Sequence, residues 1–248
     1  MSATAPVYVY GVVAARSPGR RPPVAGRPGI DGRPVRLVAA DGVGAVVSDV
    51  PEPAPGFGRE ALTAHSEVLE AVLAAATVLP MRFGVVLEGE RAVRDELLAP
   101  HRDELLAQLD RLDGRVELTL RATYQEAPLL REIMAEEAEI AAFHARRRGT
   151  YLEQIRLGEM IAAAIDARRR RDAEEILAQL TPLAEDVALG EPRHERMALS
   201  ASFLIAREGM DAFDAAVDDV GRRQHRRMRL RYTGPLPPHS FVRLEAVG

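Results

Sequence analysis

The stretch Arg115-Val-Glu-Leu-Thr-Leu-Arg-Ala-Thr-Tyr124 alternates apolar and polar residues. Alternation with a period of two is typical of a strand with one buried face. The elements expected after it are, in order, a long helical region over about 128–180, strands over Ala184–Leu189 and Met197–Ala206, a helix over Met210–Val220 and a strand over Met228–Tyr232. This β-α-β-β-α-β order is the split unit of ferredoxin-like domains. The sequence therefore predicts a ferredoxin-like domain with a long helical insertion, which we expect to be interrupted at Gly149.

The first half of the chain predicts a second α+β arrangement. Its expected elements are a buried strand over Val7–Val13, a hairpin of Val35–Ala39 and Val43–Val47, a helix over about Arg59–Ala76, an apolar strand over Met81–Leu87, and short helices over Glu90–Ala99 and Pro100–Leu112. The buried stripe of the first helix is expected to hold Leu62, Leu69, Val72, Leu73 and Ala76. Ser17–Pro34 is rich in proline, glycine and arginine and is expected to be a loop with little order of its own. We place a boundary near residue 114, which gives an N-terminal domain over 1–114 and a C-terminal domain over 115–248.

The C-terminal run Arg231-Tyr-Thr-Gly-Pro-Leu-Pro-Pro-His-Ser-Phe-Val242 follows the last expected strand. Its three prolines and one glycine exclude a helix and a central strand, because proline lacks the N–H that either structure needs. We assign the residues Gly234, Pro235, Pro237 and Pro238 to a rigid tail that is pinned across the C-terminal domain. Phe241 is its expected apolar anchor, and direct docking of a partner by this tail is the alternative.

Composition narrows the class of function. The chain has 248 residues, a net charge of -4 and no cysteine, and its basic residues are all arginine. The absence of cysteine excludes disulfides and thiolate metal sites and suits a cytoplasmic location. The absence of lysine excludes a P-loop lysine and a Schiff base. No signal peptide and no membrane-spanning run is expected.

No motif predicts catalysis, a cofactor or a metal. The six histidines include no pair at zinc-ligand spacing, and Ala198 stands where a His194-Glu195 zincin motif needs its second histidine. Gly42-Val-Gly44 is too short for a dinucleotide fingerprint, and no Gly-x-Ser-x-Gly elbow occurs. We therefore expect no enzyme.

Two arginine clusters were weighed as binding surfaces. Arg168–Arg171 is followed by Asp172, Glu174 and Glu175 at i,i+4 spacing, which favours a solvated helix whose charges are answered locally. The second cluster comprises Arg222, Arg223, Arg226, Arg227, Arg229 and Arg231. Because the last strands carry few aromatic residues for base stacking, we expect no nucleic-acid binding.

Several segments, in order and over almost the whole chain, resemble the gas vesicle protein F/L family. They are Tyr8–Val12, Val78-Leu-Pro-Met-Arg-Phe-Gly84, Leu112–Glu117, Leu199–Ile205 and the closing Thr233–Val242. The closing segment departs from the family pattern, since aromatic residues are usual where this chain has Leu236 and His239. The resemblance singles out Arg82, Phe83 and Gly84 in the first motif, and Gly234, Pro235, Pro237, Pro238 and Phe241 in the second.

The resemblance implies an accessory or minor structural protein of gas vesicles, located in the cytoplasm and on the gas vesicle. Its implied partners are the small hydrophobic shell protein and other accessory proteins. Covering the apolar face of a shell subunit would support shell nucleation or prevent aggregation. Self-association through the helices of about 128–180 is a further expectation, and no membrane contact is expected.

Two readings of the site and two rival functions stay open. Arg82 is either a strand-end residue paired with a carboxylate or a contact to another subunit, and Gly84 is expected to serve a bulge or close packing. One rival function is a family relative with an unrelated scaffolding task. The other is a ferredoxin-like small-ligand sensor or enzyme whose site is assembled from distant segments, which a deep pocket with buried titratable groups would favour.

Overall fold

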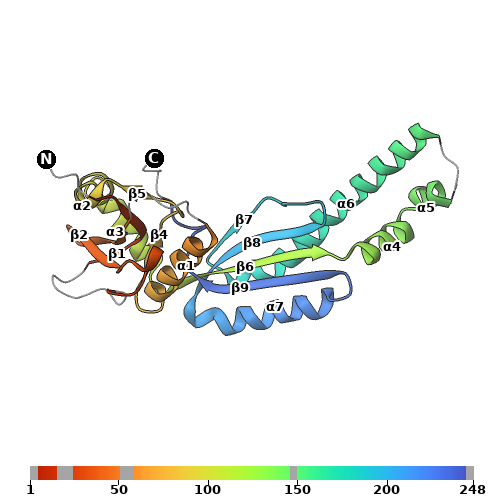
Figure 1. The fold of residues 1–248 in the computed structure, drawn as a ribbon. Coiled ribbons are helices and arrows are strands. Elements are labelled where there is room, and N and C mark those ends of the chain that lie inside the picture. The colour runs from red at the N-terminus through yellow and green to blue at the C-terminus, as the bar shows by residue number, and fades with distance from the viewer. Residues whose placement is uncertain (1–4, 16–24, 51–57, 146–149, 244–248) are drawn as a thin grey trace. The chain divides into compact units, whose positions relative to one another are not determined.

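The computed structural model describes residues 5–15, 25–50, 58–145 and 150–243 (Figure 1). Its contacts gather into two compact units. The N-terminal unit comprises Met1–Glu117 and Pro235–Gly248, and the C-terminal unit comprises Leu118–Gly234. Each unit holds one antiparallel sheet, which confirms the predicted α+β class.

The sheet of the N-terminal unit is centred on one strand with two neighbours. Its strands are β1 (Val7–Ala14), β2 (Arg36–Ala40), β3 (Val43–Asp49), β4 (Val78–Pro80) and β5 (Val86–Leu87). The order is β2-β3-β1-β4, and β5 pairs with β1 as well. The predicted hairpin is confirmed: φ is +47° at Asp41 and +89° at Gly42, and positive φ at both central residues is the two-residue turn that suits twisted strands.

Helices pack against this sheet, and the buried side chains of the first helix differ from the predicted ones. The elements are α1 (Arg59–Leu73), α2 (Gly89–Ala92), the π-helical turn η2 (Val93–Leu98) and α3 (Arg102–Arg111). Both α1 and α3 contact β1 and β4. In α1 the buried residues include Ala61, His65 and Val68, whereas Leu62 is 47% exposed. The predicted stripe was wrong at Leu62, since the buried face holds His65 instead, and at Ala76, which is exposed and lies beyond the end of α1 at Leu73.

Two segments of the N-terminal unit are built differently from the sequence prediction. Of the apolar strand predicted over 81–87, only Val86–Leu87 is a strand, β5, and residues 81–85 connect it to β4. The described part of the predicted loop is ordered: Pro28 and Pro34 form a β-bridge around the short 3-10 helix η1 (Ile30–Gly32). Its backbone is fixed from inside, since the Ile30 N–H donates to the buried Tyr10 hydroxyl at 2.8 Å.

The sheet of the C-terminal unit has the predicted ferredoxin-like order. Its strands are β6 (Arg115–Tyr124), β7 (Asp186–Leu189), β8 (Met197–Ala206) and β9 (Met228–Leu236), in the order β7-β8-β6-β9. The first and third of these strands in the chain, β6 and β8, are therefore the central ones. The two halves of the split unit interleave in this way when both crossovers place their helices on one face.

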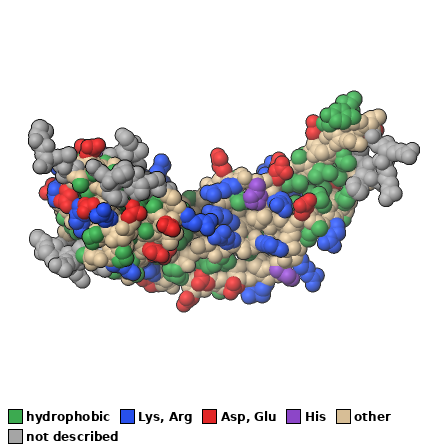
Figure 2. Space-filling view, viewed as in Figure 1, with side chains coloured by type: hydrophobic (Ala, Val, Ile, Leu, Met, Phe, Trp, Pro, Cys, Tyr) green, Lys and Arg blue, Asp and Glu red, His purple; other side chains and the backbone are tan. Residues whose placement is uncertain are grey.

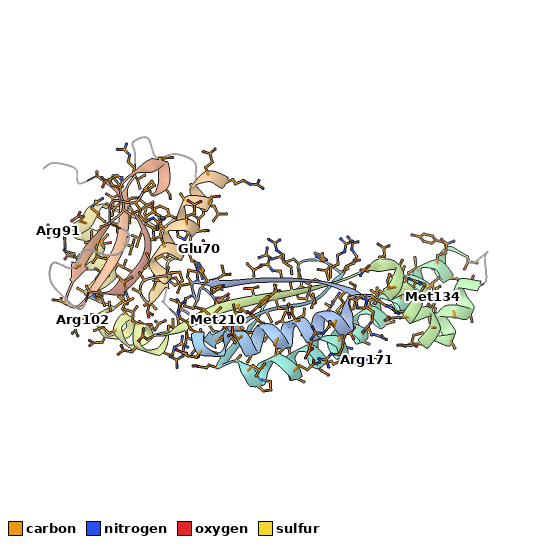
Figure 3. The ribbon with its side chains drawn as sticks, turned by 90° about the horizontal axis from the view of Figure 1, so that it is seen from below. Glu70, Arg91, Arg102, Met134, Arg171 and Met210 are labelled. Carbon is orange, nitrogen blue, oxygen red and sulfur yellow. The ribbon has the colours of Figure 1, made fainter. Side chains whose placement is uncertain are left out.

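One face of this sheet carries the core. The helices of the unit are α4 (Glu126–Glu136), α5 (Ala138–Ala145), α6 (Tyr151–Leu180) and α7 (Met210–Gln224). From below, α6 and α7 lie side by side along the sheet (Figure 3). Phe203 of β8 packs against Phe213 of α7 with ring centroids 5.0 Å apart. Thr150 and Glu153 form a capping box at the start of α6, whereas the predicted interruption at Gly149 lies outside the described residues.

The last strand continues into the proline-rich run. Gly234, Pro235 and Leu236 belong to β9, which is an edge strand where the missing N–H of a proline is tolerated. The remainder of the tail makes its contacts within the N-terminal unit, although the sequence analysis assigned it to a C-terminal domain over 115–248. The division into separately folding domains stays a prediction.

Candidate functional site

The first family motif lies where the edge of the N-terminal sheet is interrupted. Pro80 of β4 pairs with Gly11 and Val86 of β5 pairs with Tyr8, so both short strands lie along β1. Between them, Met81 N donates to Tyr10 O at 2.9 Å and Val9 N donates to Val85 O at 3.0 Å. The backbone therefore leaves β1 only over residues 82–84, which presents this turn at the sheet edge.

Gly84 is required for its backbone conformation. Its φ is +97°, which L side chains rarely adopt, and a Cβ at this position would meet no atom within 4 Å. The expectation of close packing was therefore wrong. The turn is held by a hydrogen bond from Gly84 N to the Tyr8 hydroxyl at 2.9 Å.

A buried aromatic cluster supports the turn. Tyr8, Tyr10 and His65 are buried, and the Phe83 ring lies edge-on to His65 with centroids 5.6 Å apart. The Tyr8 hydroxyl accepts from Gly84 N, so its own proton is directed to His65 Nδ1 at 2.9 Å. In this arrangement His65 is neutral and carries its proton on Nε2.

Burial keeps this cluster uncharged. It raises the pKa of Tyr8 to about 12 and lowers the pKa of His65 to about 4. A smaller part of the His65 shift comes from the neighbouring charge of His239, which belongs to the second family motif. Both motifs therefore approach His65, a residue that the sequence analysis did not single out. Its signal was a histidine at helical spacing among the buried positions Ala61, Val68 and Val72.

The proline-rich tail is anchored by one buried carboxylate. Pro237, Pro238 and Phe241 are buried, whereas Gly234 and Pro235 in β9 are exposed. Glu117 is 4% exposed, and its two oxygens accept hydrogen bonds from Ser240 N and Ser240 Oγ, both at 2.8 Å. Bonds of this kind to an ionised group are among the stronger ones in proteins.

A second clamp holds the tail on α3. Gln108 accepts from Arg243 N at 2.8 Å and donates to Arg243 O at 2.7 Å, so one amide side chain satisfies both backbone polar groups of one residue. Arg111 of the same helix donates to Phe241 O. The tail is therefore part of the N-terminal unit's hydrogen-bonded structure, and Phe241 is buried as predicted.

Arg82 is the exposed charged residue of the first motif. Among the residues that the structure describes, no carboxylate forms an ion pair with it. The structural reading, in which Arg82 pairs with a carboxylate at the strand end, therefore has no counterpart in the described chain. The role of Arg82 as a subunit contact stays a prediction.

The C-terminal unit has its own buried polar cluster. Asp172 Oδ2 accepts from the Tyr124 hydroxyl at 2.6 Å and from Arg227 Nη2 at 2.8 Å. Arg168 lies 3.5 Å away from the same oxygen, and Glu132 bonds both arginines. The solvated-helix interpretation was wrong for Arg168, whose side chain is 14% exposed, because the pattern along α6 does not show that α4 and the turn before β9 pack over it.

Exposed apolar side chains gather at the start of α6. Tyr151 is 77% exposed, Leu152 75% and Ile155 43%. Figure 2 shows hydrophobic side chains at this end of the helix. Three large hydrophobic residues within two turns are more than scattered surface residues usually amount to, and such patches mark contact surfaces.

Asp218, Gly221, Arg222 and His225 line an open pocket on the C-terminal unit. Within the described part of the chain, no cluster of three or more histidine, aspartate or glutamate side chains could hold a metal ion. None of its helices has the length and hydropathy needed to cross a bilayer. The exposed apolar side chains at the start of α6 are the feature that marks a surface for contact with another macromolecule.

Comparison with known proteins gives the family. The family model described as "Gas vesicle synthesis protein GvpL/GvpF" matches residues 6–243, and the chain belongs to this family. It is 35% identical to gas vesicle protein F of Streptomyces sp. (strain CB03234), over 95% of this chain and 98% of that protein. It is 29% identical to gas vesicle protein L2 of Halobacterium salinarum, over 95% of this chain and 90% of that protein.

Solved structures of relatives have the same fold. The crystal structure of gas vesicle protein GvpF from Anabaena sp. PCC7120 superposes with a TM-score of 0.85 at 25% identity, covering 98% of this chain and all of that one. The structure of the same protein from Microcystis aeruginosa gives a TM-score of 0.80, also at 25% identity, over 97% of this chain and all of that one. The family resemblance and its α+β fold are thereby confirmed, and a role in gas vesicle assembly follows from the family.

Proposed function

We propose that this chain supports gas vesicle assembly by binding the hydrophobic shell protein, without catalysing a reaction. Family membership over residues 6–243 is the observation that carries the proposal. A shell subunit with a large apolar face aggregates unless that face is covered before incorporation. Binding by an accessory protein would cover it and favour ordered growth of the shell. Other accessory proteins are further proposed partners, in the cytoplasm and on the gas vesicle.

The start of α6 is the surface that suits an apolar partner best. Tyr151, Leu152 and Ile155 present apolar area that lies open to solvent in this chain. Burying the three side chains in a complex would contribute roughly 25 cal/mol for each Å² of apolar surface removed from water. Self-association of two copies through the helices of 128–180 would use the same surface, so it would compete with binding of the shell protein.

In this proposal, some motif residues hold the tail in place and others are available to contact a partner. Pro237, Pro238 and Phe241 are buried and would act by holding the tail on α3. Arg82 is exposed at the interrupted sheet edge and is the motif side chain that a partner could reach. Deleting the tail would remove the clamps on Gln108 and Glu117, so point substitutions test the contact surface more cleanly than truncation.

The test is co-purification of the tagged full-length chain with a gas vesicle shell protein from the same organism. The triple variant Tyr151→Ser, Leu152→Ser, Ile155→Ser is expected to retain at most about a tenth of the shell protein that the unaltered chain retains, since each buried large side chain contributes about 1.5–3 kcal/mol.

The matched control removes three exposed hydrophobic residues elsewhere, Leu62→Ser, Leu183→Ser and Leu189→Ser. It is expected to retain the shell protein at the level of the unaltered chain. Equal loss in both triple variants would contradict the assignment of the contact to α6. Failure of the unaltered chain to retain any shell protein would contradict the proposed function itself.

A further inference from the structure

The C-terminal sheet has a second face opposite the core of its unit, on which Leu204 of β8 is buried and Ser202 is partly exposed. Phe203 of β8 points to α7, so its neighbours in the strand, Ser202 and Leu204, point to the opposite face. By the same alternation, Leu118, Leu120 and Ala122 of β6 lie in the core, and Thr119, Arg121 and Thr123 lie on the second face. The 3.4 Å approach of the Thr119 and Ser202 hydroxyls confirms that these two strands share it.

Arginine is the main charge on this face. Met228, Leu230 and Tyr232 of β9 pack toward the core, which places Arg229 and Arg231 on the second face beside Arg121 of the neighbouring strand. Figure 2 shows basic side chains gathered over the strands of this unit. Asp186 of β7 is opposite Leu204 and so lies on the same face, where its Oδ1 accepts from Val187 N at 2.9 Å.

These three arginines share one sheet face and, among the residues that the structure describes, have no side-chain partner on it. Within the described chain, Arg121, Arg229 and Arg231 form no ion pair or side-chain hydrogen bond. The Nε of Arg121 is buried and unsatisfied, which is costly for a charged donor. By contrast, Arg168 and Arg227 on the helix side share Glu132 and Asp172.

We propose that this face docks an acidic polypeptide segment of a partner protein, with Arg121, Arg229 and Arg231 binding its carboxylates. Guanidinium groups suit carboxylates because they donate in a planar fork. Thr119 and Thr123 flank Arg121 on β6, and Ser200 and Ser202 lie on the neighbouring strand β8, so their hydroxyls supply neutral hydrogen-bonding groups on the same face. The surface lies on different elements from the apolar start of α6, so it serves a second, charged contact beyond the one proposed above.

A protein segment fits this face better than a nucleic acid does. Nucleic-acid-binding ferredoxin-like sheets stack bases on aromatic side chains of their open face. Here the aromatic residues of the strands face the helices: Phe203 and Tyr232 contact Phe213, and the Tyr124 hydroxyl bonds Asp172.

The test is fluorescence anisotropy of the full-length chain with a fluorescein-labelled oligoglutamate peptide at low salt. The variant Arg121→Gln, Arg229→Gln, Arg231→Gln is expected to bind the peptide roughly tenfold more weakly, since each exposed pair contributes up to about 1 kcal/mol. Binding by the unaltered chain is expected to weaken as salt is raised, because salt screens exposed charges.

The matched control is Arg131→Gln, Arg170→Gln, Arg226→Gln, which removes the same charge from α4, α6 and the turn before β9. It is expected to lose less than about half of the affinity, because these residues lie off the sheet face. Equal weakening in both triple variants, or no saturable binding by the unaltered chain, would overturn the proposal. Tighter binding of a single-stranded oligonucleotide, lost only in the sheet variant, would overturn it in favour of a nucleic-acid surface.

Discussion

The two units each bury a tyrosine hydroxyl in a polar cluster, but the clusters differ in charge. In the N-terminal unit, Tyr8 joins Gly84 N to a neutral His65. In the C-terminal unit, Tyr124 donates to Asp172, which also holds Arg227. The first cluster is held together without charge, and the second by matching opposite charges.

The difference decides how each cluster fails. A neutral cluster resists deletion of a single hydrogen bond but is disrupted when a proton is forced on it, because a buried charge is poorly solvated. A charged cluster tolerates mild acid while its carboxylates stay ionised, but it fails when one partner is removed and the others keep their charge. The N-terminal cluster is therefore sensitive to pH and the C-terminal cluster to truncation.

The largest effect is expected from Asp172→Ala. It removes the shared acceptor of Tyr124, Arg168 and Arg227, and loss of one partner from a buried ion pair costs about 3–5 kcal/mol. The free energy of unfolding in urea at neutral pH measures it.

The control for Asp172 is Asp218→Ala on the exposed side of α7, which is expected to change the free energy of unfolding by less than about 0.5 kcal/mol. Equal stability of the two variants would show that Glu132 alone neutralises both arginines and that Asp172 is dispensable.

The next effect is the response of His65 to pH. Its folded pKa of about 4 lies below its unfolded value near 6.5, so between these values the unfolded chain binds a proton that the folded chain rejects. The stabilisation that comes from a neutral His65 is therefore complete above about pH 6.5. As the pH falls toward 4, the free energy of unfolding decreases by about 3 kcal/mol.

The variant His65→Gln removes this group, so the stability difference between it and the unaltered chain should shrink toward pH 4. Unfolding curves at several pH values measure the shrinkage, and His225→Gln, which changes an exposed histidine, should leave the pH profile as it is. A constant difference between His65→Gln and the unaltered chain would mean that His65 keeps an ordinary affinity for protons.

A smaller effect is expected where the tail is clamped. Gln108→Ala leaves the backbone N–H and C=O of Arg243 without their partner, at a cost of about 1–2 kcal/mol. Faster proteolysis of the tail and a lower unfolding midpoint measure it. Gln154→Ala, on the exposed surface of α6, is the control, and equal proteolysis in the two variants would contradict a clamp by Gln108.

The sequence predicted those elements whose patterns are local. Alternation located β6 to the residue, a run rich in Leu, Phe and Ile located β8, and the Asp41-Gly42 turn located the hairpin. The pattern failed at Met81–Leu87, because an apolar run does not show which backbone groups a neighbouring strand can reach. The sequence also did not show that the tail packs on the N-terminal unit. The bonds from Ser240 to Glu117 and from Arg243 to Gln108 span more than a hundred residues, so no local pattern indicates them.

The sequence predicted the motif residues of the candidate site but not the residues that hold those motifs in place. Arg82–Gly84 and the proline-rich run are conspicuous because glycine and proline mark special backbone positions. Gln108 and His65 are polar residues on apolar helix stripes, a signal visible only when the stripe is known to be buried. The three arginines of the open sheet face have no local signal, because their lack of partners depends on the whole surrounding surface.

The smallest effect compares one glycine of each unit. Gly84→Ala places a side chain at φ +97° with open space around it, so its cost is backbone strain alone, about 1–2 kcal/mol. Gly158→Ala in α6 also meets no atom within 4 Å, but its backbone is helical, so it should stabilise the chain by about 0.5–1 kcal/mol. Midpoints of thermal unfolding should therefore move in opposite directions for two substitutions that add the same methyl group to open space. If both midpoints rose, the turn at Gly84 would relax to a conformation that alanine tolerates, and Tyr8 would lose its bond to the backbone.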